Sequence, residues 1–152
     1  CCNPGAVVEM ATPFSKNKRV VTVMDTDVHG GTGCGMVAMI EVVALMIGKI
    51  EQAYSRERYE KPTDVRPGMM LEKGQPKSLY RPGSSQDIIL FEPGKVVFDP
   101  DIAENVRRGD VRSRLSHGFG EALVETEVEV RMSIGKAAGE KSEAERPFFF
   151  PG

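Results

Sequence analysis

The residues of this chain best suited to covalent chemistry are Gly83 and Ser84, within a Pro-Gly-Ser-Ser stretch near the middle. A serine hydroxyl in a tight turn can attack the carbonyl carbon of the preceding residue and convert the peptide bond into an ester. Elimination of that ester would leave dehydroalanine, and hydrolysis with loss of ammonia would convert this residue into a pyruvoyl group. The tripeptide Gly83-Ser84-Ser85 is equally typical of an ordinary turn, so the rest of the sequence must decide between the two.

Three other groups of residues could carry chemistry, and the sequence favours a structural role for each. Asp25, Asp27 and His29 would share one face of a straight strand, but one histidine with two carboxylates is weak evidence for a metal, and we predict none. The glycine-rich stretch 30–35 lacks the spacing and the lysine of a phosphate-binding loop. His117 is isolated in a turn, where packing or hydrogen bonding is the commoner role.

Composition narrows the class of protein. The 152 residues suit one small domain, and a net charge of −2 with 7% aromatic residues and no tryptophan argues against a nucleic-acid partner. Three cysteines, Cys1, Cys2 and Cys34, favour a reducing compartment. The longest apolar run, 36–47, is interrupted by Glu41 and is shorter than the roughly 18 residues that span a bilayer. We therefore expect a piece of a longer protein that is cytoplasmic or peripheral to a membrane.

The elements that must position Gly83 and Ser84 are mostly strands. The β-branched stretch 19–27 predicts one strand, and 36–50 predicts a buried strand that is long and bent or divided in two, with a bulge or a close backbone approach at Gly48. The clearest alternation, in 124–134, predicts a strand with a core face and a solvent face. Asp99 followed by Pro100 predicts a short helix that runs to Arg108.

These elements predict a mainly β (α+β) fold, an antiparallel barrel-like or sandwich-like sheet with short helices. We expect a single core over residues 1–135 and a flexible tail over 136–152. Ser84 is expected at the start of a strand that lies next to the strand of 36–50.

The order of several motifs carries a family resemblance. They are Asn17-Lys-Arg-Val-Val21, the apolar stretch 36–50, Met70-Leu-Glu-Lys-Gly-Gln75, Tyr80-Arg-Pro-Gly-Ser-Ser85 and Leu90-Phe-Glu-Pro-Gly-Lys-Val96. Taken together, over roughly residues 17–135, the chain resembles the carboxy-terminal part of phosphatidylserine decarboxylases and their relatives.

The resemblance implies that a precursor cuts itself between Gly83 and Ser84. The β chain would end at Gly83, and the α chain would begin at Ser84, which acts as the nucleophile and becomes the pyruvoyl cofactor. The ketone of that cofactor would form a Schiff base with the substrate amine and accept electrons as carbon dioxide leaves. The implied reaction converts phosphatidylserine to phosphatidylethanolamine. Relatives that decarboxylate a soluble amino acid such as tryptophan keep a second substrate class open.

One part of the family pattern is absent from these residues. The base for self-cleavage is a histidine in an upstream Tyr-His-Arg-like motif, supported by an aspartate, and neither His29 nor His117 fits it by order. We therefore expect an incomplete site within this sequence. A relative that no longer cuts itself and serves as a scaffold also stays open.

Partners follow from the same reasoning. Besides an amine substrate, the resemblance makes a homodimer plausible. A peripheral membrane contact could use the cations of 56–77, namely Arg56, Arg58, Lys61, Arg66, Lys73 and Lys77, although interspersed carboxylates suit a plain solvated surface equally well. A different class is a non-catalytic β-barrel module of the biotinyl or lipoyl type. It would need a lysine at a hairpin tip, and Lys73 and Lys77 have poorly matching neighbours.

Overall fold

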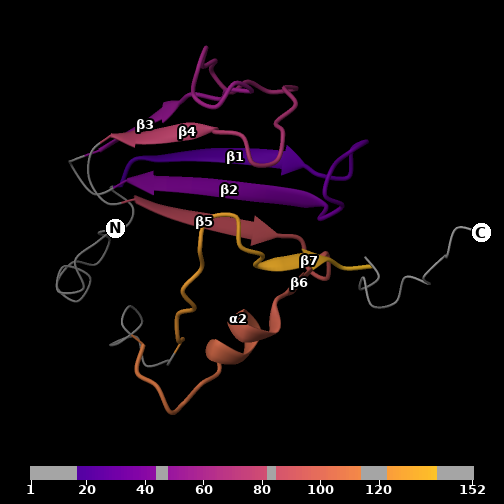
Figure 1. Ribbon diagram of the computed structural model, residues 1–152, viewed down its shortest axis with the longest axis vertical. Helices are drawn as coiled ribbons and strands as arrows, with labels where there is room; N and C mark the ends of the chain where they lie inside the picture. Colours follow the sequence, from indigo (N-terminus) through magenta and orange to yellow (C-terminus); the bar gives the residue numbers. More distant parts are fainter. Residues whose placement is uncertain (1–16, 44–47, 82–84, 114–122, 140–152) are drawn as a thin grey trace, which may run out of the picture. The chain divides into compact units, whose positions relative to one another are not determined.

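The structure is a computed structural model that describes residues 17–43, 48–81, 85–113 and 123–139. Within them lie seven strands and one short helix (Figure 1). In chain order these are β1 (Arg19–Asp25), β2 (Met36–Val43), β3 (Lys49–Gln52), β4 (Ser78–Arg81), β5 (Ser85–Phe91), β6 (Val96–Phe98), α2 (Pro100–Asn105) and β7 (Gly135–Ala137). The predicted mainly β class is confirmed.

The strands form three sheets in the described part of the chain. The largest has the order β1-β2-β5, and the arrows of its neighbouring strands point in opposite directions (Figure 1). β3 pairs antiparallel with β4, so that Ile50 lies opposite Tyr80, and β6 pairs antiparallel with β7. The stretch 36–50 thus contributes two strands, β2 and the beginning of β3.

Contacts divide the chain into two compact units. The first comprises Cys1–Met24 and Ala38–Leu90, and the second comprises Asp25–Val37 and Phe91–Gly152. Each unit therefore takes residues from both sides of the bond between Gly83 and Ser84, which we call the predicted cleavage site.

Strand β2 supplies buried positions by simple alternation. Val37, Glu41 and Val43 are all buried, as expected for residues an even number of positions apart on a strand. The Asn17 side-chain amide donates to the Val43 carbonyl at 2.7 Å. An added Cβ at Gly48 would lie 2.8 Å from the Val43 Cβ, so of the two predictions for Gly48 the structure shows a close approach, made by the Val43 side chain. The glutamate that interrupts the apolar run is therefore a core residue.

The prediction of a strand over 124–134 is wrong. No strand is assigned there, Val130 is 93% exposed and Arg131 has a φ of +69°. The Met132 N–H donates to the Glu129 carbonyl at 3.0 Å and closes a turn. Alternation produces a strand only where the backbone finds a partner strand for its hydrogen bonds, and that pairing begins at Gly135 instead.

One predicted boundary also shifts. Helix α2 ends at Asn105 rather than at Arg108, because the chain turns there, with the Arg108 N–H donating to the Asn105 carbonyl at 3.1 Å. Pro100 does occupy the start of the helix as predicted, but the Asp99 side chain makes no capping hydrogen bond. β7 runs to Ala137, which is buried, while the predicted division into a core over 1–135 and a tail over 136–152 stays a prediction.

Candidate active site

Gly83 and Ser84 lie within residues 82–84, outside the described residues. The strands on either side are described. β4 ends at Arg81, and β5 begins at Ser85 and is the sheet neighbour of β2. The strand after the predicted cleavage site thus lies next to β2 as the sequence predicts, β4 was not among the predicted strands, and the place and role of Ser84 stay predictions. His117, Cys1 and Cys2 also lie outside the described residues.

A hydrogen bond connects the two strands that flank the predicted cleavage site. The Tyr80 hydroxyl on β4 donates to the Asp87 carboxylate on β5. Burial of the phenol, followed by the hydrogen bond and the charge of Asp87, raises the pKa of Tyr80 well above its usual value near 10. The phenol therefore stays protonated and remains a donor at any physiological pH.

Replacing Tyr80 with phenylalanine removes this hydrogen bond and is expected to change how the free energy of unfolding depends on pH in the alkaline range. Because the folded-state pKa of Tyr80 is raised, its contribution to the free energy of unfolding is fully present below about pH 10 and is lost as pH rises beyond it. The stability difference between wild type and Tyr80→Phe should therefore be constant up to about pH 10 and shrink above it. Urea unfolding at a series of pH values measures this difference.

The companion variant is Asp87→Asn, which keeps an acceptor but removes the charge. It should lower the pKa of Tyr80 relative to wild type, as followed by phenolate absorbance. Equal phenolate titrations in wild type and Asp87→Asn would contradict the assigned contact.

The second feature beside the predicted cleavage site is a buried polar group of four side chains, Glu41, Gln52, Lys77 and Ser78, which we call the Glu41 cluster. The Glu41 side chain is 0% exposed, and that of Lys77 is 12% exposed. Lys77 Nζ lies 2.6 Å from Glu41 Oε2, and Gln52 Nε2 donates to the same oxygen at 3.2 Å. The Ser78 hydroxyl donates to Glu41 Oε1. Both carboxylate oxygens are therefore satisfied, as a buried charge requires.

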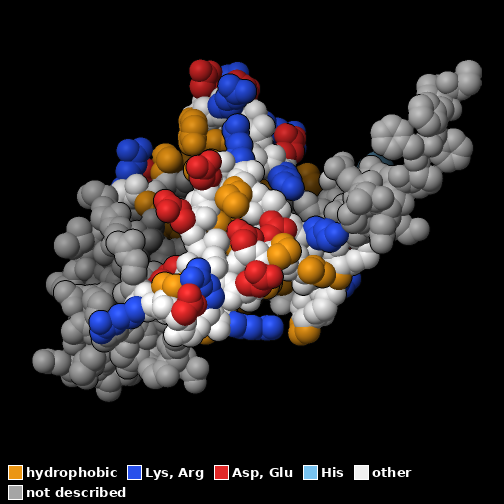
Figure 2. All heavy atoms as spheres, turned by 60° about the horizontal axis from the view of Figure 1, so that its bottom comes forward, with side chains coloured by type: hydrophobic (Ala, Val, Ile, Leu, Met, Phe, Trp, Pro, Cys, Tyr) orange, Lys and Arg blue, Asp and Glu red, His pale blue; other side chains and the backbone are white. Residues whose placement is uncertain are grey.

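The Glu41 cluster changes the expectation for the cations of 56–77. Lys77 faces the interior, so it is neither a headgroup-facing lysine nor one displayed for modification. Arg56 pairs with Glu72 at 3.2 Å, and Lys61 pairs with Glu57 at 2.8 Å. Acidic and basic side chains lie interspersed on the face that Figure 2 shows. Within the described residues, no helix is long and apolar enough to cross a bilayer.

Charged side chains on β3 form ion pairs with the end of β4 and with each other at the surface. The Arg81 guanidinium lies 3.4 Å from Glu51, and Lys49 donates to the same carboxylate at 2.8 Å. The hydrogen bond from Lys49 is the main cause that lowers the pKa of Glu51. Arg81, the last described residue before the predicted cleavage site, is thereby linked to β3.

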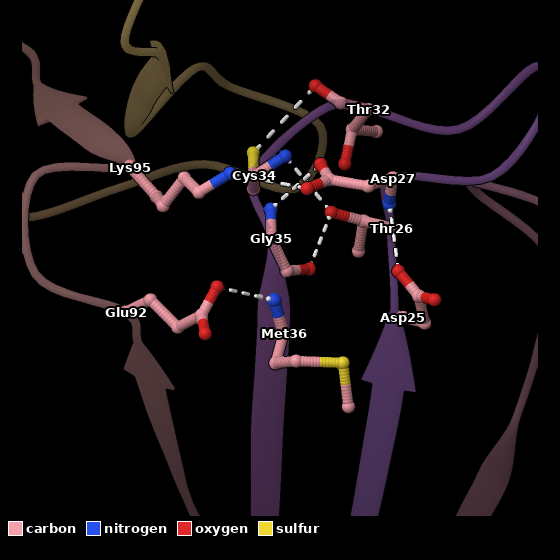
Figure 3. A network of polar contacts seen from close by, with 9 residues as sticks. All are labelled: Asp25, Thr26, Asp27, Thr32, Cys34, Gly35, Met36, Glu92 and Lys95. Atoms are coloured by element: carbon pink, nitrogen blue, oxygen red, sulfur yellow. Dashed lines mark hydrogen bonds and ion pairs between the residues drawn. The ribbon is translucent and has the colours of Figure 1, made fainter.

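Asp27, in the loop between β1 and β2, has a structural role (Figure 3). Asp27 accepts the Gly35 N–H at 3.1 Å and pairs with Lys95 at 3.1 Å. The hydrogen bond from Lys95 is the largest cause that lowers the pKa of Asp27. Gly35 has a φ of +72°, and a Cβ there would meet Glu92 Oε2, which accepts the Met36 N–H at 2.9 Å.

These contacts link residues that precede the predicted cleavage site with residues that follow it, all within the second unit. His29 lies in the same loop and is exposed. The described residues contain no group of three potential ligands that could hold a metal ion.

Sequence reasoning missed the Glu41 cluster. The available signal was a glutamate at an alternating position inside an apolar run, which the strand period places in the core. Its partners could not be found in this way, because Lys77 lies 36 residues farther along the chain.

The sequence of this chain is similar to that of a known protein family. The model of the phosphatidylserine decarboxylase family matches residues 1–121. A phosphatidylserine decarboxylase proenzyme of Chlamydia caviae is 32% identical over 124 residues, which are 81% of this chain and 36% of that protein. The proenzyme of Chlamydia pneumoniae is 32% identical over 119 residues, 78% of this chain and 34% of that protein. No solved structure matches the chain.

The chain belongs to the phosphatidylserine decarboxylase family. It spans about a third of the length of the curated relatives it matches.

Proposed function

We propose that this chain is part of a pyruvoyl-dependent phosphatidylserine decarboxylase whose precursor cuts itself between Gly83 and Ser84. The observation that carries the proposal is membership of the family together with a glycine–serine pair between β4 and β5. The relatives are named proenzymes, which supports a processed precursor.

The self-cleavage reaction balances with one water molecule. The Ser84 hydroxyl attacks the Gly83 carbonyl carbon, and the amide becomes an ester while the Ser84 nitrogen becomes a free amine. A base removes the Ser84 α proton, the ester C–O bond breaks, and Gly83 leaves as a carboxylate. The resulting dehydroalanine tautomerises to an imine, and water replaces its nitrogen, which departs as ammonia. The ketone that remains is the pyruvoyl group at the start of the α chain.

When present, the pyruvoyl group supplies an electron-accepting ketone for loss of carbon dioxide from an amine-bearing substrate. The chain fits this group because a serine is a chemical source of a pyruvoyl group and Ser84 directly precedes the first residue of β5. Tyr80 and Asp87 connect the two strands whose ends the reaction would separate.

The contacts across the predicted cleavage site support an association of the two products. Lys95 with Asp27, and Glu92 with the Met36 N–H, would become contacts between an α chain and a β chain. Because each compact unit contains residues from both sides of the cut, both chains are needed to complete either unit. We assign the base for self-cleavage to a segment other than those of His29 and His117, since neither fits the order of the family pattern.

The substrate proposed is phosphatidylserine, after the name of the family. A soluble amino acid on the same core is the competing substrate. Lys77 is disfavoured as the modified lysine of a carrier module, because its ammonium is held by Glu41 and Gln52 rather than displayed. Contact with a membrane surface and a homodimer remain part of the proposal.

The test uses the protein expressed from its complete gene. We expect two chains on a denaturing gel and an α chain that resists amino-terminal sequencing and is lighter by one ammonia than a peptide that starts at Ser84. Release of phosphatidylethanolamine from vesicles that contain phosphatidylserine, with free tryptophan as the comparison substrate, identifies the substrate class. A single chain that stays intact on long incubation would contradict the proposal.

A further inference from the structure

The Glu41 carboxylate lies at an unusual place for a charge. It belongs to the inward-facing residues of β2, in line with Val43, and its side chain is completely buried. An ion pair in such a place is weak evidence for stability, because apolar side chains of similar volume often serve as well or better. What an ion pair with directed hydrogen bonds adds is a defined relative position of the segments that carry it.

The segments that the Glu41 cluster holds are those around the predicted cleavage site. Lys77 and Ser78 stand at the beginning of β4, which reaches its last residue at Arg81. Gln52 belongs to β3, the partner of β4. The carboxylate therefore holds the β3–β4 pair against β2.

The other side of the predicted cleavage site is held by the same strand. β5 begins at Ser85 and is the sheet neighbour of β2. β2 is thus the common reference for both flanking strands: it positions β5 through sheet pairing and β4 through the side chain of Glu41. The Tyr80–Asp87 hydrogen bond joins the two strands directly.

We propose that Glu41 is a positioning residue for self-cleavage, which acts through Lys77 and Ser78 by holding β4, the strand that leads to the predicted cleavage site. This inference rests on the proposed function. Attack on a carbonyl is sensitive to small displacements, and a misplacement of about 1 Å can cost about a hundredfold in rate. Glu41 takes no part in the bond changes.

The test compares the rate of chain cutting in variants of the complete protein that remain folded. The Glu41→Leu, Lys77→Met double variant replaces the ion pair with apolar side chains of similar length. It is expected to fold and to be cut between about tenfold and about a hundredfold more slowly than wild type. Its uncut chain should resist hydroxylamine, which cleaves esters, because the amide-to-ester step is the one that is slowed.

The matched control is Val43→Ala, which weakens the core on the same face of β2 without touching the cluster. It should be cut at the wild-type rate at temperatures where circular dichroism shows it folded. The conservative Glu41→Gln variant keeps an oxygen acceptor for Ser78 and should be cut faster than the double variant.

Three results would count against the inference. A double variant that is cut at the wild-type rate overturns it. The inference is also overturned if chain cutting is slowed in the same proportion to the loss of unfolding free energy in Val43→Ala and in the double variant. The role of Glu41 would then be only structural. A wild-type protein that stays uncut overturns the proposed function itself, and this inference with it.

Discussion

Replacing Ser84 by alanine in the complete protein is expected to leave one uncut chain with no decarboxylase activity. Alanine has no hydroxyl to attack the Gly83 carbonyl, so neither the ester nor the pyruvoyl group can form. The loss should be total rather than partial, because the same residue is the nucleophile of cleavage and the source of the cofactor. Denaturing electrophoresis and intact mass measure the cutting, and release of phosphatidylethanolamine measures the activity.

The chain offers a matched control in the next residue. Ser85→Ala removes an identical hydroxyl one position later, where the backbone already belongs to β5. This variant should still be cut, with an α chain that begins at residue 84 and carries the blocked end. Equal cutting of Ser84→Ala and Ser85→Ala would refute the assignment of Ser84, and cutting lost only in Ser85→Ala would move the cleavage site by one residue.

Lys77→Met is expected to cause a large loss of folding stability. The change leaves the fully buried Glu41 carboxylate without its counter-charge at 2.6 Å. Removal of one partner of a buried pair typically costs about 3–5 kcal/mol. Because domains are stable by only about 5–15 kcal/mol, the variant should be marginally folded. Denaturant unfolding at neutral pH gives the free energy of unfolding.

A second lysine provides the comparison. Lys49 pairs with Glu51 at a similar distance, 2.8 Å, but its side chain is 65% exposed, and exposed pairs contribute little to stability. Lys49→Met should therefore change the free energy of unfolding far less than Lys77→Met. Adding Glu41→Leu to Lys77→Met should recover most of the loss, because no unpaired charge remains buried. Equal losses in the two single variants would show that Glu41 reaches solvent.

The two predictions concern different properties of neighbouring residues. Ser84 is expected to control the chemistry and to matter little for folding before cleavage. Lys77 is expected to control folding. Glu41 is expected to affect both folding and self-cleavage. Its carboxylate needs Lys77 for neutralisation, and it holds the strand that leads to Gly83.

Local pattern predicted the elements whose signal is carried by the residues themselves. The β-branched residues of β1 and β2 and the close approach at Gly48 could be found because side-chain branching and the lack of a Cβ act within a few residues. The same method failed at 124–134, where alternation was regular but Val130 is exposed and no partner strand pairs with the backbone in the described residues. A strand needs a partner strand, and no local pattern contains one.

The sequence by itself determined the mainly β class, the membership of the family that its ordered motifs indicate, and the choice of Gly83 and Ser84 as the predicted cleavage site. Those inferences depend on residue types and their order. Only the tertiary structure decided that Lys77 faces the Glu41 carboxylate and that Tyr80 and Asp87 join the flanking strands. These contacts arise from strand pairing between distant segments, which residue order alone does not specify.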